Sequence, residues 1–315
     1  MMKTNLAVIF PGQGSQAVGM GKELAEKYPV ARQTFEEADE ALGFKFSQIC
    51  FEGPEDKLRL TEITQPAILT TSIAAWRVAK ENGLEPAFMA GHSLGEYSAH
   101  VAAGTISFAD AVRTVRNRGK YMQEAVPVGV GVMAAVLGMG LQPLTAVCHE
   151  AAQGEVCDPA NINSPDQIVI SGNTVAVERA AKLAEERGAK RAKLLPVSAP
   201  FHCSLMKPAQ DRLAVDLNAL TFNTPSVPVV CNVDAAIVSN GASRDALIRQ
   251  VTGSVKWEQS MRLLIEKGVE TFVEVGPGKV LCGLMRQIDR TKKCVNVEDE
   301  ASLQKALGQL AAVSA

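Results

Sequence analysis

The residues best suited to chemistry in this chain are Gly-His-Ser-Leu-Gly at positions 91–95, which form a Gly-x-Ser-x-Gly pattern. The apolar run 87–90 precedes them and a helix-favouring segment, 96–103, follows. A strand, a sharp turn bounded by glycines and a helix are the setting of a nucleophile elbow, which exposes the serine hydroxyl. The turn also puts the Leu94 N–H at a helix N-terminus, where it can face an oxyanion. The pattern predicts Ser93 as a nucleophile; the alternative is a tight turn with an incidental serine.

The chain has four histidines that could act as the general base: His92, His100, His149 and His202. We expect His149 to be solvated, His100 to point away from the elbow and His92 to play a supporting part. His202 follows a predicted strand in a proline-bounded loop, C-terminal to Ser93, which is the order found in the hydrolase fold. The sequence therefore favours His202 as the base. The alternative is that His202 is a loop histidine that makes only a structural hydrogen bond.

No acidic residue completes a catalytic triad in an obvious way. Asp110, Asp158 and Asp166 lie between Ser93 and His202, but none of them ends a convincing strand of the main sheet. A backbone carbonyl or an amide oxygen could orient the imidazole instead, although a neutral acceptor stabilises imidazolium less than a carboxylate does.

The helix predicted over residues 108–122 carries an arginine on its inward face. At about 100° per residue, one narrow stripe holds Ala111, Val115, Arg118 and Met122. A buried arginine without a partner is costly, so we expect Arg118 to meet a carboxylate. That carboxylate belongs either to the protein or to a substrate held bidentately by the guanidinium. The spacing leaves both alternatives open.

A glycine-rich loop, residues 11–16, follows a first buried strand predicted over residues 5–10. Its next glycine, Gly19, comes two positions too late for the dinucleotide-binding fingerprint. In a hydrolase-like arrangement such a loop supplies the second oxyanion donor. We therefore expect Gln13 at the edge of the sheet, close to the nucleophile.

The order of elements changes between residues 130 and 197. Strands are predicted over 130–137, 156–163, 167–171 and 193–197, with helices over 143–152 and 174–186. This β-α-β-β-α-β order is the ferredoxin-like one. The predicted fold class is α/β: an α/β-hydrolase-like large domain with a parallel sheet and a nucleophile elbow (residues 1–127 and 198–315), interrupted by an inserted ferredoxin-like small domain (residues 128–197).

Composition narrows the function classes. The 315 residues are 47% hydrophobic and carry a net charge of -2, which gives no reason to expect nucleic acid or a membrane as partner. The seven cysteines are scattered without a Cys-x-x-Cys pair, which argues against a disulfide framework or a zinc site and fits a reducing cytoplasm. Cys203 is disfavoured as nucleophile because it adjoins His202, and adjacent extended residues point to opposite sides.

Together these motifs resemble the malonyl-CoA:acyl carrier protein transacylases, the acyltransferases of fatty-acid synthesis. The matching segments are 10–16, 65–66, 91–96, 118–119, 161–164, 201–202 and 274–278. The resemblance implies ping-pong transfer of malonyl from malonyl-CoA to the phosphopantetheine thiol of acyl carrier protein. No cofactor or metal is implied, since coenzyme A is part of the substrate and phosphopantetheine belongs to the carrier. We expect the protein to be cytoplasmic and monomeric.

The resemblance also implies roles for single residues. Ser93 would carry the malonyl ester, His202 would be the base and Arg118 would hold the free malonyl carboxylate. The N–H groups of Gln13 and Leu94 would bind the oxyanion.

Three further positions follow from the resemblance. Gln250 would orient His202 through an oxygen, of either its side chain or its backbone. Phe201 would leave little room for an α-methyl group, and Asn163 would lie among the substrate-binding residues. Basic residues near the cleft are candidates for docking the carrier protein: Lys190, Arg191 and Lys279.

Two other functions use the same residues differently. A thioesterase or esterase would share the nucleophile, but a hydrolase of neutral acyl chains has no need of a buried Arg118. A non-catalytic carrier-protein docking module would need neither the elbow nor His202.

Overall fold

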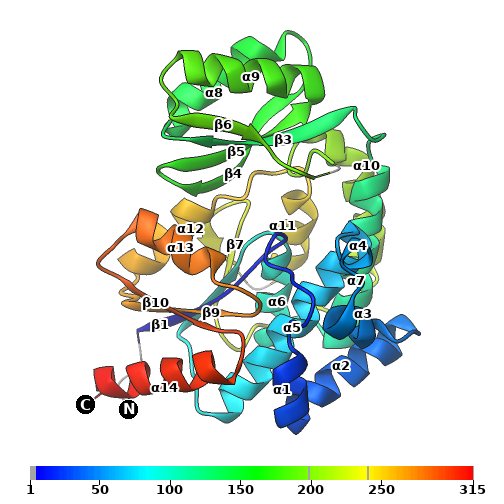
Figure 1. The fold of residues 1–315 in the computed structure, drawn as a ribbon, viewed down its shortest axis with the longest axis vertical. Helices are drawn as coiled ribbons and strands as arrows, with labels where there is room; N and C mark the ends of the chain where they lie inside the picture. The colour runs from blue at the N-terminus through cyan, green and yellow to red at the C-terminus, as the bar shows by residue number, and fades with distance from the viewer. Residues whose placement is uncertain (1–4, 198, 240, 315) are drawn as a thin grey trace.

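The computed structural model describes residues 5–197, 199–239 and 241–314, and its mixed α/β fold is built on two sheets (Figure 1). The larger sheet has six strands in the order β10-β9-β1-β2-β7-β8. Its neighbours pair in parallel except β7 and β8. The bounds are β1 (Leu6–Phe10), β2 (Phe88–Gly91), β7 (Val229–Cys231), β8 (Ala236–Ile237), β9 (Thr271–Val275) and β10 (Lys293–Val297). Both β1 and β9 are buried throughout, as apolar strands of a sheet covered on two faces are.

The smaller sheet is antiparallel, with the order β4-β5-β3-β6, and lies at one end of the molecule (Figure 1). Its chain order is β3 (Gly131–Leu137), α8 (Leu141–Ala152), β4 (Cys157–Ser164), β5 (Gln167–Asn173), α9 (Thr174–Glu186) and β6 (Arg191–Leu194). Only β6 departs clearly from its predicted range. It ends at Leu194 because its ladder with β3 runs from Arg191 to Leu194. The domain boundaries at 127/128 and 197/198 stay predictions, and Ser198 lies outside the described residues.

Helices cover the larger sheet. They are α1 (Lys22–Lys27), α2 (Pro29–Leu42), α3 (Phe46–Glu52), α4 (Glu55–Leu58), α5 (Thr61–Glu81), α6 (Leu94–Ala102), α7 (Phe108–Glu124), α10 (Lys207–Asn218), α11 (Ser243–Gln250), α12 (Trp257–Glu266), α13 (Val280–Ile288) and α14 (Glu300–Ser314). Several of them differ from the sequence reading. The local signal of Pro66 predicts a helix from residue 67, but α5 begins at Thr61 with Pro66 inside it, because burial of nearly every later residue outweighs one lost hydrogen bond. The sequence reading did not predict α3, α4, α10, α13 or α14.

Two cysteines form a disulfide, which the sequence analysis argued against. Cys282 of α13 and Cys294 of β10 are 12 residues apart, with Cα atoms separated by 5.3 Å. The contact arises where α13 packs against the edge of the larger sheet, which cysteine spacing alone does not reveal. The five other cysteines are free and buried.

The two sheets meet along β4. The Ile162 N–H donates to the Val255 carbonyl at 2.9 Å, and the Val255 N–H donates to the Ala160 carbonyl at 2.8 Å. The small sheet is therefore fixed over the carboxyl edge of the larger one, where β1 and β2 end side by side. Among the described residues, no helix has the length and apolarity needed to cross a membrane.

Candidate active site

The turn at residues 91–95 is a strained elbow between β2 and α6. Ser93 has φ 51° and ψ −105°, a backbone conformation that residues with side chains rarely adopt. A Cβ on Gly91 would lie 1.9 Å from the Gly95 backbone, and one on Gly95 would lie 2.1 Å from the Phe10 carbonyl oxygen. Glycine is thus required at both positions for the helix to pack against β1 and aim the serine outward.

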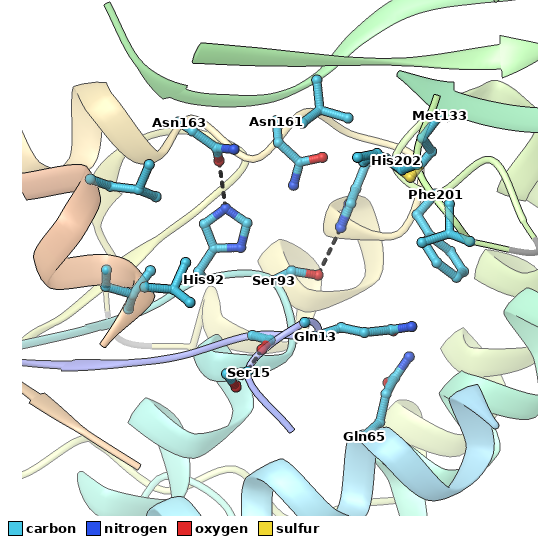
Figure 2. A pocket seen from close by; sticks show the side chains of 18 of the residues that line it. Gln13, Ser15, Gln65, His92, Ser93, Met133, Asn161, Asn163, Phe201 and His202 are labelled. Carbon is cyan, nitrogen blue, oxygen red and sulfur yellow. Dashed lines mark hydrogen bonds between the residues drawn. The ribbon is translucent and has the colours of Figure 1, made fainter. Parts of the chain in front are cut away.

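His202 reaches the serine from the opposite wall of the pocket (Figure 2). Its Nε2 lies 2.7 Å from Ser93 Oγ, and its Nδ1 lies 2.9 Å from the Gln250 backbone carbonyl oxygen. Since a carbonyl can only accept, Nδ1 carries the proton and Nε2 is free to accept one from Ser93. Burial, followed by the nearby charge of Arg118, lowers the pKa of His202 to about 3. The imidazole is therefore neutral at neutral pH, with Nε2 free to accept a proton.

Arg118 lies on the inward face of α7, as the helical periodicity predicted, and is 2% exposed. Its Nη1 donates to Gln65 Oε1 at 2.9 Å, and its Nη2 donates to Gln250 Oε1 at 2.9 Å and to Ser93 Oγ at 3.2 Å. Its Nε–H has no partner among the described residues. No protein carboxylate bonds Arg118 among the described residues; two amide oxygens take that place, so the cation keeps donors for another group.

A set of buried amides and one carboxylate supports the elbow from below. The Asn232 Oδ1 accepts from the Ser93 N–H at 2.7 Å, and the Asn232 Nδ2 donates to the Gly91 carbonyl at 2.8 Å. The Gln250 Nε2 donates to the Ser93 carbonyl at 2.9 Å and to Glu96 Oε2 at 2.7 Å. Ser93 is thus held through its backbone while its hydroxyl stays available to His202.

A pocket of about 250 Å³ opens over Ser93 between the two sheets. Loops at the edge of the larger sheet contribute Gln13 and Ser93, helix α7 contributes Arg118, and the small sheet contributes Asn163 and Met133. Phe201, which is 8% exposed, forms part of the wall beside His202 (Figure 2). The structure therefore gathers all the predicted site residues around this pocket, with Leu94 and Gln250 just beneath its floor.

The expected oxyanion donors occupy suitable places. Leu94 is the first residue of α6, so its N–H has no acceptor within the helix. Gln13 is exposed in the loop after β1, on the rim of the same pocket. A helix N-terminus and a neighbouring loop are the elements that usually provide such donors.

The other histidines have separate surroundings. His92 Nε2 lies 2.8 Å from Asn163 Oδ1 and links the elbow to β4. Burial lowers the pKa of His92 and lowers that of His100 to about 4, so both are neutral at neutral pH. His149 is exposed on α8, as expected.

The acidic candidates for a triad lie elsewhere. Asp110 accepts from Ser107 and Arg113 at the start of α7, and Asp166 pairs with Lys190 on the surface. No set of three or more metal-ligating side chains occurs in the part of the chain that the structure describes.

Three functional positions were missed by sequence reasoning or given no role: Gln65, Glu96 and Asn232. Asn232 follows β7 directly, and the carboxyl ends of parallel strands are where polar site residues gather. That rule, applied to the apolar run 228–231 that precedes it in the sequence, would have identified it.

Comparison with known proteins places the chain in a family. A model described as "Acyl transferase domain" matches residues 8–310. The malonyl CoA-acyl carrier protein transacylase of Salmonella typhimurium is 51% identical over 308 residues, which cover 97% of this chain and 100% of that protein. The chain belongs to the malonyl CoA-acyl carrier protein transacylase family.

Solved structures of transacylases agree. The enzyme of Coxiella burnetii is 44% identical and has a TM-score of 0.95, covering 98% of each chain. A malonyl-transacylase in complex with a type II PKS acyl-carrier protein is 49% identical, with a TM-score of 0.94, covering 96% of this chain and 99% of that one. Parallel and antiparallel sheets arranged as in Figure 1 are thus the transacylase fold.

Proposed function

We propose that this chain transfers a malonyl group from malonyl-CoA to the phosphopantetheine thiol of acyl carrier protein, in fatty-acid synthesis, through an ester on Ser93. The observation that carries the proposal is that three groups, the His202 imidazole, the Ser93 hydroxyl and the Arg118 guanidinium, meet in one pocket. His202 Nε2 lies 2.7 Å from Ser93 Oγ, and the Arg118 guanidinium lies 3.2 Å from the same oxygen. A base, a nucleophile and an anchor for a carboxylate therefore meet at one atom.

In the first half-reaction, Ser93 Oγ attacks the thioester carbonyl as His202 Nε2 takes the hydroxyl proton. The oxyanion forms against the N–H groups of Leu94 and Gln13, and one such donor is typically worth ~10²–10³ in rate. The C–S bond then breaks, and the coenzyme A thiolate receives the proton from His202.

The second half-reaction reverses these steps with a different thiol. His202 deprotonates the phosphopantetheine thiol, whose sulfur attacks the malonyl ester. The ester C–O bond breaks, and Ser93 recovers its proton from His202. Throughout, Arg118 binds the free malonyl carboxylate, and the Phe201 ring restricts space beside the α-carbon.

The proposal extends to the type of each domain, the oligomeric state, the compartment and the docking contact. The parallel sheet with its elbow is α/β-hydrolase-like (residues 1–127 and 198–315), and the βαββαβ unit is a ferredoxin-like insertion (residues 128–197). The enzyme acts as a cytoplasmic monomer without a cofactor of its own. Lys279 is the favoured docking contact among the basic candidates, because Val280 and Leu281 beside it line the pocket.

Mass spectrometry after brief incubation with malonyl-CoA tests the proposal. A malonyl adduct is expected on Ser93 and is expected to disappear in Ser93→Ala. An adduct on Cys203 would overturn it; the thiol is buried, bonds the Pro200 carbonyl at 3.2 Å and has its pKa raised by burial to about 11. A donor series of malonyl-, methylmalonyl- and acetyl-CoA, with and without carrier protein, then separates transfer from hydrolysis.

A further inference from the structure

Glu96 is a fully buried carboxylate on α6, three residues past the nucleophile. Its Oε2 accepts hydrogen bonds from Gln250 Nε2 at 2.7 Å and from the Asn232 N–H at 3.0 Å. Its Oε1 has no hydrogen-bond partner among the described residues. A buried carboxylate is costly, so its retention at this place needs a reason.

Two acceptors decide which way the Gln250 side chain faces: Glu96 Oε2 accepts from its Nε2 at 2.7 Å, and the Ser93 carbonyl accepts from the same nitrogen at 2.9 Å. An amide has a donor end and an acceptor end, whereas a carboxylate only accepts and a guanidinium only donates. With its Nε2 bonded to Glu96, Gln250 presents Oε1 to Arg118 Nη2 at 2.9 Å. The reverse orientation would place two donors against each other.

These hydrogen bonds form a relay from Glu96 through Gln250 to Arg118. The relay holds the guanidinium in place but leaves it without a carboxylate bonded to it directly. A carboxylate bonded directly to the guanidinium would compete with a carboxylate on the substrate. Here an amide stands between Glu96 and Arg118. Burial raises the pKa of Glu96 to about 7, and its ionised form opposes the effect of burial on Arg118, which lowers the pKa of the guanidinium. Glu96 thus steadies the cation without occupying the donors that a substrate needs.

We propose that Glu96 is a positioning residue for selection of carboxylated acyl groups: it fixes the Gln250 amide, which in turn holds Arg118 in place for the substrate carboxylate. The inference rests on the proposed function. Its signature is a change in the preference for malonyl over acetyl donors, because an acetyl group does not use Arg118. A purely structural role would lower both activities together.

Three variants separate these outcomes, each assayed for kcat/KM with malonyl-CoA and acetyl-CoA. In Glu96→Met the carboxylate acceptor is gone and Gln250 Nε2 keeps only the Ser93 carbonyl. The malonyl-to-acetyl ratio is expected to fall about tenfold or more, the usual worth of a hydrogen bond to a charged group. In Glu96→Gln the amide oxygen takes the place of Oε2, and the ratio is expected to stay within about threefold of the wild-type ratio. Gln250→Met keeps the backbone carbonyl that holds His202 and is expected to match Glu96→Met.

The double variant Glu96→Met/Gln250→Met is expected to lose no more selectivity than either single one, since both changes break one relay. Asp39→Asn is the control for loss of a buried carboxylate. Asp39 accepts from the Ser47 N–H at 2.7 Å on the distant α2, and its variant is expected to keep the wild-type ratio.

The inference is wrong if Glu96→Met keeps the wild-type ratio, if Glu96→Gln loses as much as Glu96→Met, or if the two losses add in the double variant. If Glu96→Met does not fold, Gln250→Met is still expected to lower the ratio about tenfold and Glu96→Gln to keep it; a wild-type ratio in Gln250→Met, or a tenfold loss in Glu96→Gln, would then refute the inference. A wild-type enzyme that shows no preference for malonyl would instead overturn the proposed function, so the two failures are distinguishable.

Discussion

Replacing Arg118 by methionine removes the only side-chain cation that touches Ser93 Oγ among the described residues, and keeps a chain of similar length. Three of its five N–H donors are used, by Gln65, Gln250 and Ser93, and the rest can bind a substrate carboxylate. Two charge-assisted hydrogen bonds to that carboxylate are worth roughly 3–6 kcal/mol. At about 1.4 kcal/mol per tenfold, kcat/KM for malonyl-CoA is expected to fall ~10²–10⁴-fold.

The assay compares malonyl-CoA with acetyl-CoA by following release of the coenzyme A thiol. Acetyl carries no carboxylate, so its slow turnover is expected to change by less than about tenfold. The variant also leaves two buried amide oxygens, those of Gln65 and Gln250, without the hydrogen bonds that Arg118 donates to them. Its thermal unfolding midpoint must therefore be measured as well. Arg116→Met is the matched control, because Arg116 lies on the same helix but stacks over the Phe44 ring at 5.0 Å.

Two results would refute this reasoning. If the malonyl rate falls by less than tenfold, Arg118 does not bind the carboxylate. If both donors slow to the same extent while the fold is intact, Arg118 acts on the nucleophile and not on the substrate. Loss of activity in Arg116→Met would show that a change in α7 itself is responsible.

Three further predictions concern stability. Burial lowers the pKa of His100 to about 4 from an ordinary 6.5, so the unfolded chain binds its proton first and stability is lost as pH falls below 6.5. The free energy of unfolding should fall between pH 7.5 and pH 5 in both proteins, but by about 2 kcal/mol less in His100→Gln than in the wild type. Urea titration at the two pH values measures this difference, and equal losses would contradict the prediction. Gly95→Ala should lower stability by about 3 kcal/mol or prevent folding, because its Cβ would meet Phe10. Gly283→Ala, an open helical site, should gain ~0.5–1 kcal/mol in the same titration.

The elbow and Arg118 could be predicted from the sequence because their signals are local. A glycine two residues on either side of Ser93 reports a tight turn, and the position of Arg118 follows from helical periodicity over residues 108–122. The βαββαβ order between residues 130 and 197 was equally readable, since strands and helices there alternate with clear turn signals. In each case, residues close in sequence carry the whole pattern.

The supporting network could not be read in this way. Gln250, Asn232 and Glu96 make contacts across 132 to 157 positions of sequence, and none of these contacts leaves a periodic trace. The same holds for the Cys282–Cys294 disulfide, which depends on where a helix returns to the sheet. The long helix α5 was shortened in prediction because a proline signal is local, whereas the burial that overrides it is tertiary.

The oxygen that orients His202 is a backbone carbonyl, and backbone groups have no residue signature at all. That choice also bears on the chemistry. A carbonyl stabilises imidazolium less than a carboxylate does, and the adjacent Arg118 destabilises it further, so the proton taken from Ser93 is held weakly. A thiolate leaving group, with a thiol pKa near 8.5, departs without needing a long-lived imidazolium. An amine leaving group would need that proton held until the bond breaks. In the second half-reaction the leaving group is the Ser93 alkoxide, and the weakly held proton is transferred to it from His202 as the ester C–O bond breaks. The arrangement therefore favours exchange of an acyl group between thiols over cleavage of an amide.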